Sequence, residues 1–228
     1  METTLERPIL AVDLVVFRMS NRTLEVLIQK RQSEPFKNAP ALPGVAVRIE
    51  ESLKDAAYRT LEEKAGIIPA ISDNLFLDQL ATFDALYRDP RGRTVSVAYI
   101  GLIRDGNNLT SNSILWVSVI DLLRRSLPFD HNQIIKTAVD RLKGKLKYTN
   151  IAGGFLPDLF RIEALQEIYE AVLNRPLNRT NFRNKLLKIN MIEQVSTLNE
   201  AVGQKGGRPP HLYRFTRDLI ETVGRDFL

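Results

Sequence analysis

The first half of the chain alternates short apolar runs with turn-forming residues. β-Branched and aromatic residues are concentrated in runs of strand length, and Gly, Pro, Asn and Asp separate the runs, as expected for the strands of a sheet. The runs that we interpret as strands are 9–17, 24–29, 79–85, 94–103 and 116–120. This half is therefore predicted to be built around a β-sheet.

One helix is predicted among these strands, at 53–65. It consists of helix-forming residues and follows Ser52, with Asp55 three residues later as a variant of the capping box. It stops at Gly66, the residue type that most often ends a helix in the left-handed conformation.

The pattern changes after 128–132, and we place a domain boundary there, which gives domains 1–130 and 131–228. Apolar residues at helical spacing then predict helices at 133–146, 161–173 and 180–189. Between the first two, the apolar segment 151–160 contains Gly and Pro and suits a short strand or a docking segment.

A loop rich in Gly, Pro and basic residues lies between two β-like runs near the end of the chain. The runs are 191–195 and 211–215, and the loop ends in Lys205-Gly206-Gly207-Arg208-Pro209-Pro210. Two helices joined by a tight turn, followed by two strands that flank such a loop, are the element order of a winged helix-turn-helix. The second helix of that motif, here 180–189, enters the major groove of DNA.

Composition narrows the class of protein. Apolar residues make up 44 % of the 228 residues and charged residues 26 %, as in ordinary soluble proteins. The chain has no Cys and only two His, so it has no disulfide or thiolate metal site, and we expect no metal ligands. The apolar run 9–17 is interrupted by Asp13 and has no basic segment before it, which excludes a signal peptide and a membrane span. A cytoplasmic location is expected.

Basic residues are concentrated in the winged helix segment. Nine basic residues and two acidic ones lie between Arg175 and Arg217, whereas the whole chain has a net charge of +5. A basic helix face is often only a solvated surface, but here it coincides with a DNA-binding element order. We expect double-stranded DNA to be contacted by base-reading and phosphate-binding side chains, namely Asn181, Arg183, Asn184, Lys185, Lys205, Arg208, His211 and Arg214. RNA is an alternative ligand, but the basic helix offers no aromatic platform for unstacked bases.

The first domain contains a sequence that resembles the Nudix box. Aligned on Arg59 and Gly66, the segment retains Glu51, Arg59, Leu61, Glu63, Gly66 and Ile67 of that motif. It departs from the motif in three places, because Val45 replaces a Gly and Thr60 and Lys64 replace two carboxylates. An amphipathic surface helix with an Arg59–Glu63 pair is the plainer alternative, but the neighbouring Leu42-Pro43-Gly44 and Asp89-Pro90-Arg91-Gly92-Arg93 resemble segments of ADP-ribose-class Nudix proteins.

The missing carboxylates bear on catalysis. Nudix hydrolysis needs hard oxygen ligands that hold Mg²⁺ on a diphosphate, and Lys64 places an ammonium where the cation should lie. We therefore expect no catalytic residues and little or no pyrophosphatase activity. Lys64 and Arg59 would instead neutralise the diphosphate of a bound ligand. An active Nudix hydrolase of ADP-ribose-like compounds is the competing hypothesis.

A degenerate Nudix domain followed by a winged helix is similar to the Nudix-related transcriptional regulators of NAD metabolism. The resemblance implies an α+β protein, with a mixed-sheet α/β/α Nudix sandwich followed by a winged helix-turn-helix domain. It implies a dimeric repressor of NAD biosynthesis or salvage genes that binds palindromic operators, needs no cofactor and responds to ADP-ribose or a related nucleotide. Carried over by position, the effector-binding residues would be Arg31, Glu51, Arg59, Glu63 and Arg93.

Overall fold

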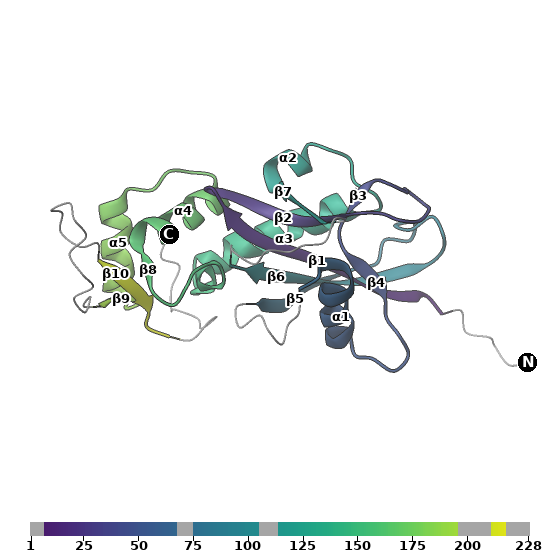
Figure 1. The fold of residues 1–228 in the computed structure, drawn as a ribbon, viewed down its shortest axis with the longest axis horizontal. Helices are drawn as coiled ribbons and strands as arrows, with labels where there is room; N and C mark the ends of the chain where they lie inside the picture. Colours follow the sequence, from purple (N-terminus) through teal and green to yellow (C-terminus); the bar gives the residue numbers. More distant parts are fainter. Residues whose placement is uncertain (1–6, 68–74, 105–113, 196–210, 218–228) are drawn as a thin grey trace, which may run out of the picture. The chain divides into compact units, whose positions relative to one another are not determined.

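The computed structural model describes residues 7–67, 75–104, 114–195 and 211–217 (Figure 1). The chain divides into two compact units, one made of residues 1–18 and 25–139 and the other of 19–24 and 140–228. The division falls inside helix α3 (His131–Leu146), whereas the sequence pattern placed the boundary just before that helix.

A mixed seven-stranded sheet forms the first unit. Its strand order is β3-β2-β1-β6-β5, with β4 added beside β1 and β7 beside β2. β1 and β6 run parallel, whereas β6 pairs antiparallel with β5 and β2 pairs antiparallel with β7. The strands are β1 (Ile9–Ser20), β2 (Thr23–Lys30), β3 (Pro40–Ala41), β4 (Gly44–Ala46), β5 (Phe76–Phe83), β6 (Thr94–Ile103) and β7 (Ile114–Ser118).

All five strands expected in this half are present; 94–103 has the predicted ends, and the ends of the other four differ by up to three residues. The last of them, β7, ends at Ser118, and a short helix, α2 (Val119–Leu123), follows at once. The Ser118 hydroxyl accepts the backbone N–H of Asp121, which is a helix cap that the β-rich composition of 116–120 concealed. β3 and β4 were not expected, since two or three residues are too few to show a period.

Helix α1 (Leu53–Ala65) is confirmed with both of its predicted ends. The Ser52 hydroxyl accepts the N–H of Asp55 while the Asp55 carboxylate accepts the N–H of Ser52, and Gly66 closes the helix at φ 63°. Its buried face, which includes Ala57 and Leu61, packs on alternate residues of the central strand β1. The first turns of α3 lie on the opposite side of the sheet, which gives the expected α/β/α layering (Figure 1).

The second unit has the elements of a winged helix. After α3 come a 3₁₀ helix η1 (Ile151–Phe155), β8 (Phe160–Arg161), α4 (Ile162–Leu173), α5 (Arg179–Lys188), β9 (Ile192–Val195) and β10 (Leu212–Phe215). The three strands form an antiparallel sheet in the order β8-β10-β9. The segment 151–160, expected as a strand or docking segment, is a buried 3₁₀ helix that leads into a two-residue strand.

The turn between α4 and α5 fixes the helix pair. Asn174 ends α4 at φ 53°, and the Asn178 side chain begins α5 by accepting the N–H of Asn181. Behind the turn the rings of Tyr169 and Phe182 pack edge to face, with their centroids 5.0 Å apart. No helix in the parts of the chain that the structure describes is long and apolar enough to cross a membrane.

Candidate ligand pocket and nucleic-acid interface

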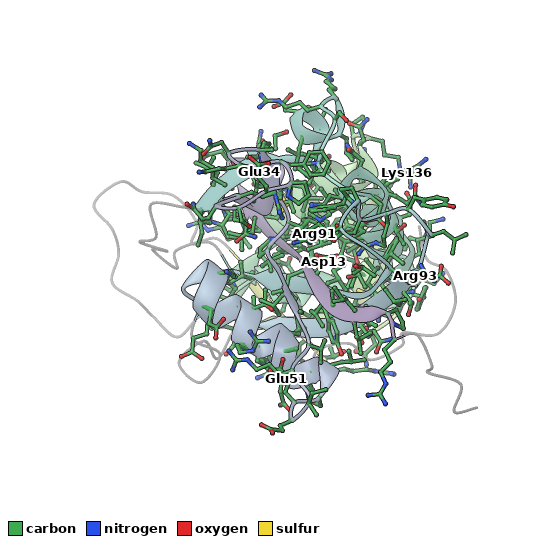
Figure 2. The ribbon with its side chains drawn as sticks, turned by 90° about the vertical axis from the view of Figure 1, so that its right-hand side faces the viewer. Asp13, Glu34, Glu51, Arg91, Arg93 and Lys136 are labelled. Atoms are coloured by element: carbon green, nitrogen blue, oxygen red, sulfur yellow. The ribbon has the colours of Figure 1, made fainter. Side chains whose placement is uncertain are left out.

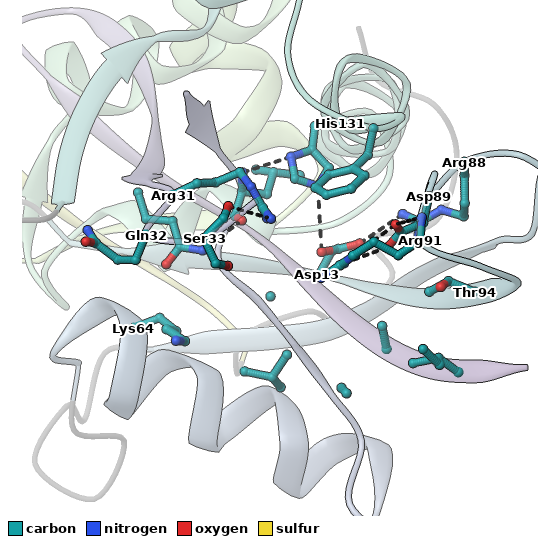
Figure 3. A pocket seen from close by; sticks show the side chains of 18 of the residues that line it. Asp13, Arg31, Gln32, Ser33, Lys64, Arg88, Asp89, Arg91, Thr94 and His131 are labelled. Atoms are coloured by element: carbon teal, nitrogen blue, oxygen red, sulfur yellow. Dashed lines mark hydrogen bonds and ion pairs between the residues drawn. The ribbon is translucent and has the colours of Figure 1, made fainter. Parts of the chain in front are cut away.

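A pocket of about 360 Å³ opens in the first unit. Its walls come from β1, β2 and β4, from the end of α1, and from the segments 31–33, 88–94 and 129–131 (Figure 3). Seven of its lining side chains are charged or ionisable in addition to His131, and five of these seven are basic: Lys30, Arg31, Lys64, Arg88 and Arg91, against Asp13 and Asp89. The excess of cations favours an anionic ligand.

A buried ion network closes the inner end of the pocket. The Arg88 guanidinium lies 3.1 Å from the Asp13 carboxylate and 2.6 Å from the Asp130 carboxylate. The Ser96 hydroxyl donates a further hydrogen bond of 2.6 Å to Asp13. Because the Arg88 side chain is only 4 % exposed, its charge depends on these two carboxylates for compensation. Arg88 therefore joins β1 to the residue that precedes α3.

Gly44 is required beside this network. A Cβ atom at residue 44 would lie 2.3 Å from the Asp13 carboxylate and 2.9 Å from the Val12 carbonyl oxygen. The Leu42-Pro43-Gly44 sequence thus allows β4 to pair with β1 directly over a buried carboxylate.

His131 begins α3 and contacts the same network. Its Nδ1 accepts the backbone N–H of Leu42 at 3.1 Å, and its Nε2 lies 3.8 Å from the Asp13 carboxylate. Burial lowers the pKa of His131 below its ordinary value of 6.5, an effect larger than the opposing attraction of Asp13. The imidazole is therefore neutral at physiological pH.

The neutral His131 makes stability depend on pH. Below pH 6.5 the unfolded chain takes up a proton at this residue while the folded protein resists it, so the free energy of unfolding should fall by up to about 1.4 kcal/mol per pH unit. This contribution is fully present above pH 6.5 and is lost as the pH falls toward the lowered folded-state pKa. We expect His131→Asn, which keeps an acceptor for the Leu42 N–H, to flatten this part of the pH profile. Urea unfolding of wild type and variant between about pH 5 and 8 measures the effect.

Replacement of the exposed His211 by Asn is the matched control, because it removes the same type of side chain outside the pocket. An equal slope in wild type and His131→Asn would contradict the assignment of a buried neutral imidazole.

An aromatic ring lies close to two guanidinium groups at the pocket wall. The guanidinium carbons of Arg31 and Arg91 lie 4.8 Å and 5.7 Å from the centroid of the Phe129 ring. Arg31 is held in place by hydrogen bonds to the carbonyl oxygens of Pro35 and Ser33, and Arg91 by a 2.6 Å ion pair with Asp89. Arg91 and its hydrogen bonds lower the pKa of the Asp89 carboxyl, and burial and Arg91 lower the pKa of Arg31.

The structure separates the residues that the sequence pattern assigned to the effector. Arg31 lines the pocket, whereas Glu51, Arg59, Glu63 and Arg93 are not among its lining residues. Figure 2 shows Glu51 apart from Asp13 and Arg91, and Arg93 donates to the carbonyl oxygens of Asp84 and Ala85. The effector-binding role of these residues remains a prediction.

The two carboxylates retained from the Nudix box are engaged by arginine. The Arg59 guanidinium lies 2.5 Å from Glu51 and 3.3 Å from Glu63, and Arg48 donates its backbone N–H to Glu51. These hydrogen bonds, that from Arg59 foremost, lower the pKa of Glu51 to about 2. Glu51 is thus an anion bound within the protein over the whole physiological range.

The motif helix does not present a set of oxygen ligands suited to Mg²⁺. The Thr60 hydroxyl is buried and donates to the Ala56 carbonyl oxygen, and the Lys64 side chain lines the pocket. Mg²⁺ requires near-octahedral coordination by oxygen atoms. Within residues 7–67, 75–104, 114–195 and 211–217, no group of three acidic or His side chains could hold a metal ion.

Several ionisable pocket residues were not assigned to the effector from sequence, among them Asp13, Arg88, Asp89 and His131. Asp13 carried a signal, since a carboxylate inside an otherwise apolar buried strand must be paired in the folded protein. Its partners are remote in the sequence, so the chain alone does not reveal them.

Helix α5 presents polar side chains of the expected kind. Asn181, Asn184 and Lys185 are exposed and Arg183 is half-buried, while Phe182 and Leu186 face inward. Arg183 donates to the Asn184 side-chain oxygen at 3.1 Å, so the two side chains form one polar surface. Asn181, Arg183, Asn184 and Lys185 thus remain predicted DNA contacts on the outer face of this helix.

The wing strands carry two further predicted contacts. His211 is exposed beside Gln194, 2.9 Å from its amide nitrogen, and Arg214 is paired with Glu193. Lys205 and Arg208 lie outside the described residues. Arg214 would have to exchange Glu193 for a phosphate in order to bind DNA.

These observations define the class of the protein as a Nudix-type ligand-binding domain linked to a winged helix. Residues 7–138 match the family model of the NUDIX domain, and residues 152–215 match that of the NrtR DNA-binding winged helix domain. The ADPR responsive transcriptional repressor NtrR of Acinetobacter baylyi is 34 % identical over 91 % of this chain and 82 % of its own length. The chain therefore belongs to the NrtR family of NUDIX-domain transcriptional repressors.

Solved structures agree with this placement. Shewanella oneidensis NrtR in complex with a 27mer DNA has a TM-score of 0.77 at 29 % identity, covering 96 % of this chain and 97 % of that one. The NUDIX domain of the same protein with ADP ribose has a TM-score of 0.53 at 31 % identity, covering 60 % of this chain and 90 % of that one.

A sequence relative of the first domain is an enzyme. An ADP-ribose pyrophosphatase of Methanocaldococcus jannaschii is 31 % identical over 57 % of this chain and 72 % of its own length.

Proposed function

We propose that this protein is a transcriptional repressor that binds operator DNA through its winged helix domain and ADP-ribose in its Nudix pocket. The observation that carries the proposal is the similarity to an ADPR responsive repressor along both domains, over 91 % of the chain. The cationic pocket and the exposed polar face of α5 support it, because the chemistry of each is complementary to that of its proposed ligand. Such a repressor acts in the cytoplasm, where the chromosome of a bacterium lies.

We further infer which genes the protein regulates, what kind of operator it binds and how it assembles. The regulated genes are those of NAD biosynthesis or salvage, and the protein binds a palindromic operator as a homodimer. Two-fold symmetric proteins place their recognition helices about 34 Å apart, which fits two half-sites one helical turn apart. The proposed domains are 1–130 and 131–228, with α3 as the helix that connects the ligand-binding domain to the DNA-binding domain.

Ligand response is a shift between two states of the repressor. ADP-ribose changes DNA binding only if it binds one state more tightly than the other. The pocket provides a physical basis for that preference, because Phe129 and His131 both line it. Phe129 lies two residues before α3, and His131 is the first residue of that helix. A ligand that contacts this segment acts on a helix that continues past the Nudix domain.

The pocket is proposed to bind ADP-ribose without hydrolysing it. Thr60 and Lys64 replace two motif carboxylates, and the retained Glu51 and Glu63 share Arg59. We expect no turnover when ADP-ribose is incubated with the protein and Mg²⁺ or Mn²⁺, with AMP release measured by chromatography. The M. jannaschii ADP-ribose pyrophosphatase is the positive control.

The second candidate function is that of an ADP-ribose hydrolase, which the similarity to that pyrophosphatase favours. Metal-dependent release of AMP at a rate near that of the control enzyme would support the hydrolase and would overturn the proposal of a non-catalytic sensor domain.

A further inference from the structure

Three cations of the pocket have no carboxylate partner among the described residues. Asp13 and Asp89 are each satisfied within the protein, by Arg88 and Arg91 respectively. Lys30, Arg31 and Lys64 remain, and none of the three forms an ion pair within the described part of the chain. The unpaired cations that a ligand can contact are therefore these three side chains.

Lys64 has a distinct place among the three. It is the only one supplied by α1, the helix that carries the Nudix box, and it is exposed at the last turn of that helix. Figure 3 shows it extending from α1 across the pocket from Arg31 and His131. A ligand phosphate that contacts Arg31, directly after β2, would thus meet an ammonium on the opposite wall.

The same helix lacks the ligands for a divalent ion. Thr60 donates its hydroxyl to the Ala56 carbonyl, and Glu63 shares Arg59 and Arg48 at 3.3 Å and 3.5 Å. One partly exposed carboxylate that is already paired with two guanidinium groups does not form an oxygen cage for Mg²⁺. An ammonium beside it would further repel the ion.

We propose that Lys64 is a ligand-binding residue that replaces the metal ion, so that the pocket binds a nucleoside diphosphate through ammonium and guanidinium contacts and without Mg²⁺. The proposal deepens, and rests on, the proposed function of the Nudix domain as a sensor of ADP-ribose. It differs from the assignment made from sequence, because Arg59 is paired with Glu51 at 2.5 Å and lies outside the pocket lining. Arg31 takes the place of Arg59 as the second cation.

The first test measures ADP-ribose binding to the full-length protein by isothermal titration calorimetry, in buffer with Mg²⁺ and in buffer with EDTA. Wild type should bind equally well in both. Lys64→Met should weaken binding about tenfold or more in both buffers, since a charge-assisted contact to phosphate is lost. In EDTA, Lys64→Glu should weaken binding more strongly than Lys64→Met does, because it places a carboxylate against the diphosphate.

Matched controls separate a local role from a general effect of charge. Lys54→Met removes an exposed lysine of the same helix that does not line the pocket, and it should leave the affinity unchanged. Adenosine, which lacks phosphate, should bind wild type and Lys64→Met with the same affinity. Because Lys64 is exposed, Lys64→Met and Lys64→Glu should unfold like wild type.

Two outcomes would overturn the proposal in distinguishable ways. If wild type binds ADP-ribose in Mg²⁺ and loses it in EDTA, or if Lys64→Met binds like wild type, the sensor function stands and the metal-free mode of binding fails. If wild type binds ADP-ribose in neither buffer, the proposed effector itself fails, and the role of Lys64 fails with it.

Discussion

Replacing both Arg183 and Lys185 by alanine is expected to weaken operator binding about 100-fold or more at physiological salt. The two side chains lie on the outer face of α5, the second helix of the winged helix unit. A cation that reads a base edge contributes about 1–3 kcal/mol, and one that neutralises a phosphate adds a counterion-release term. Fluorescence anisotropy with operator DNA, repeated over a series of salt concentrations, measures both the loss of affinity and the expected decrease in salt dependence.

The matched control removes the same number of charges from the Nudix unit. Lys54 and Lys136 are exposed on α1 and α3, and their joint replacement by alanine should leave operator affinity within about twofold, because neither contacts DNA in the proposed mode. Equal losses in the two double variants would mean that net charge alone attracts the DNA, which would contradict a specific role for α5.

Arg88→Met is expected to lower the free energy of unfolding by about 3–5 kcal/mol, because it leaves two carboxylates without their shared cation in a buried site. The side chain is 4 % exposed and compensates Asp13 and Asp130 at 3.1 Å and 2.6 Å. Those carboxylates raise the pKa of Arg88 in spite of the opposing effect of burial, so it stays charged at every pH at which the protein folds. Urea unfolding followed by the intrinsic fluorescence of Trp116 measures the change.

Arg48→Met provides the comparison for this experiment. Arg48 pairs with Glu63 at 3.5 Å and its side chain is 65 % exposed, so its loss should change stability by no more than about 1 kcal/mol. A similar small change for Arg88→Met would contradict the view that the buried network holds the pocket together.

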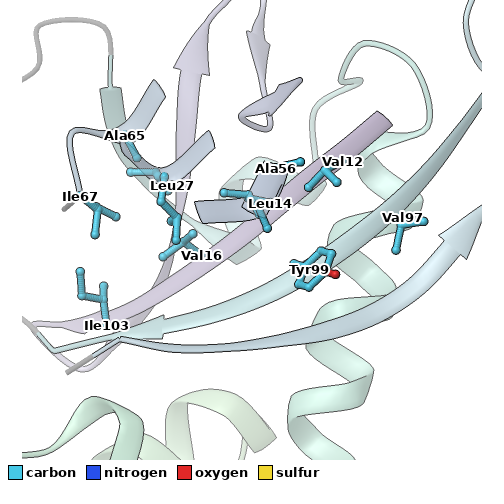
Figure 4. Close-up of a cluster of buried hydrophobic side chains, with 12 residues drawn as sticks. Val12, Leu14, Val16, Leu27, Ala56, Ala65, Ile67, Val97, Tyr99 and Ile103 are labelled. Carbon is cyan, nitrogen blue, oxygen red and sulfur yellow. The ribbon is translucent and has the colours of Figure 1, made fainter. Parts of the chain in front are cut away.

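Much of the fold could be predicted from local signals. The capping box at Ser52 and the left-handed Gly66 fix both ends of α1, and these are contacts between residues close in sequence. The apolar run 9–17 predicted a strand, and Figure 4 shows Val12, Leu14 and Val16 of β1 in the buried core. Helix α2 was mistaken for the end of a strand, because its Val and Ile residues have high strand propensity and its cap decides the outcome.

The site was predicted less completely, because its geometry comes from pairing across the sheet. Arg31 could be assigned to the pocket from the family resemblance, but Arg88 meets Asp13 and Asp130 through contacts of long sequence separation. Lys64 was recognised as a departure from the motif, whereas the engagement of Arg59 by Glu51 depends on the path of the loop that precedes α1. Motif alignment identifies which residues are present and leaves their partners undetermined.

ADP-ribose in the Nudix domain is proposed to control DNA binding by the winged helix. The most direct test is fluorescence anisotropy with palindromic DNA from the upstream region of the protein's own gene, at physiological salt, with and without ADP-ribose. We expect tight, sequence-dependent binding whose affinity changes in the presence of ADP-ribose. Sequence-specific binding that ADP-ribose leaves unchanged at saturating concentration, or the absence of specific binding together with hydrolysis of the nucleotide, would contradict it.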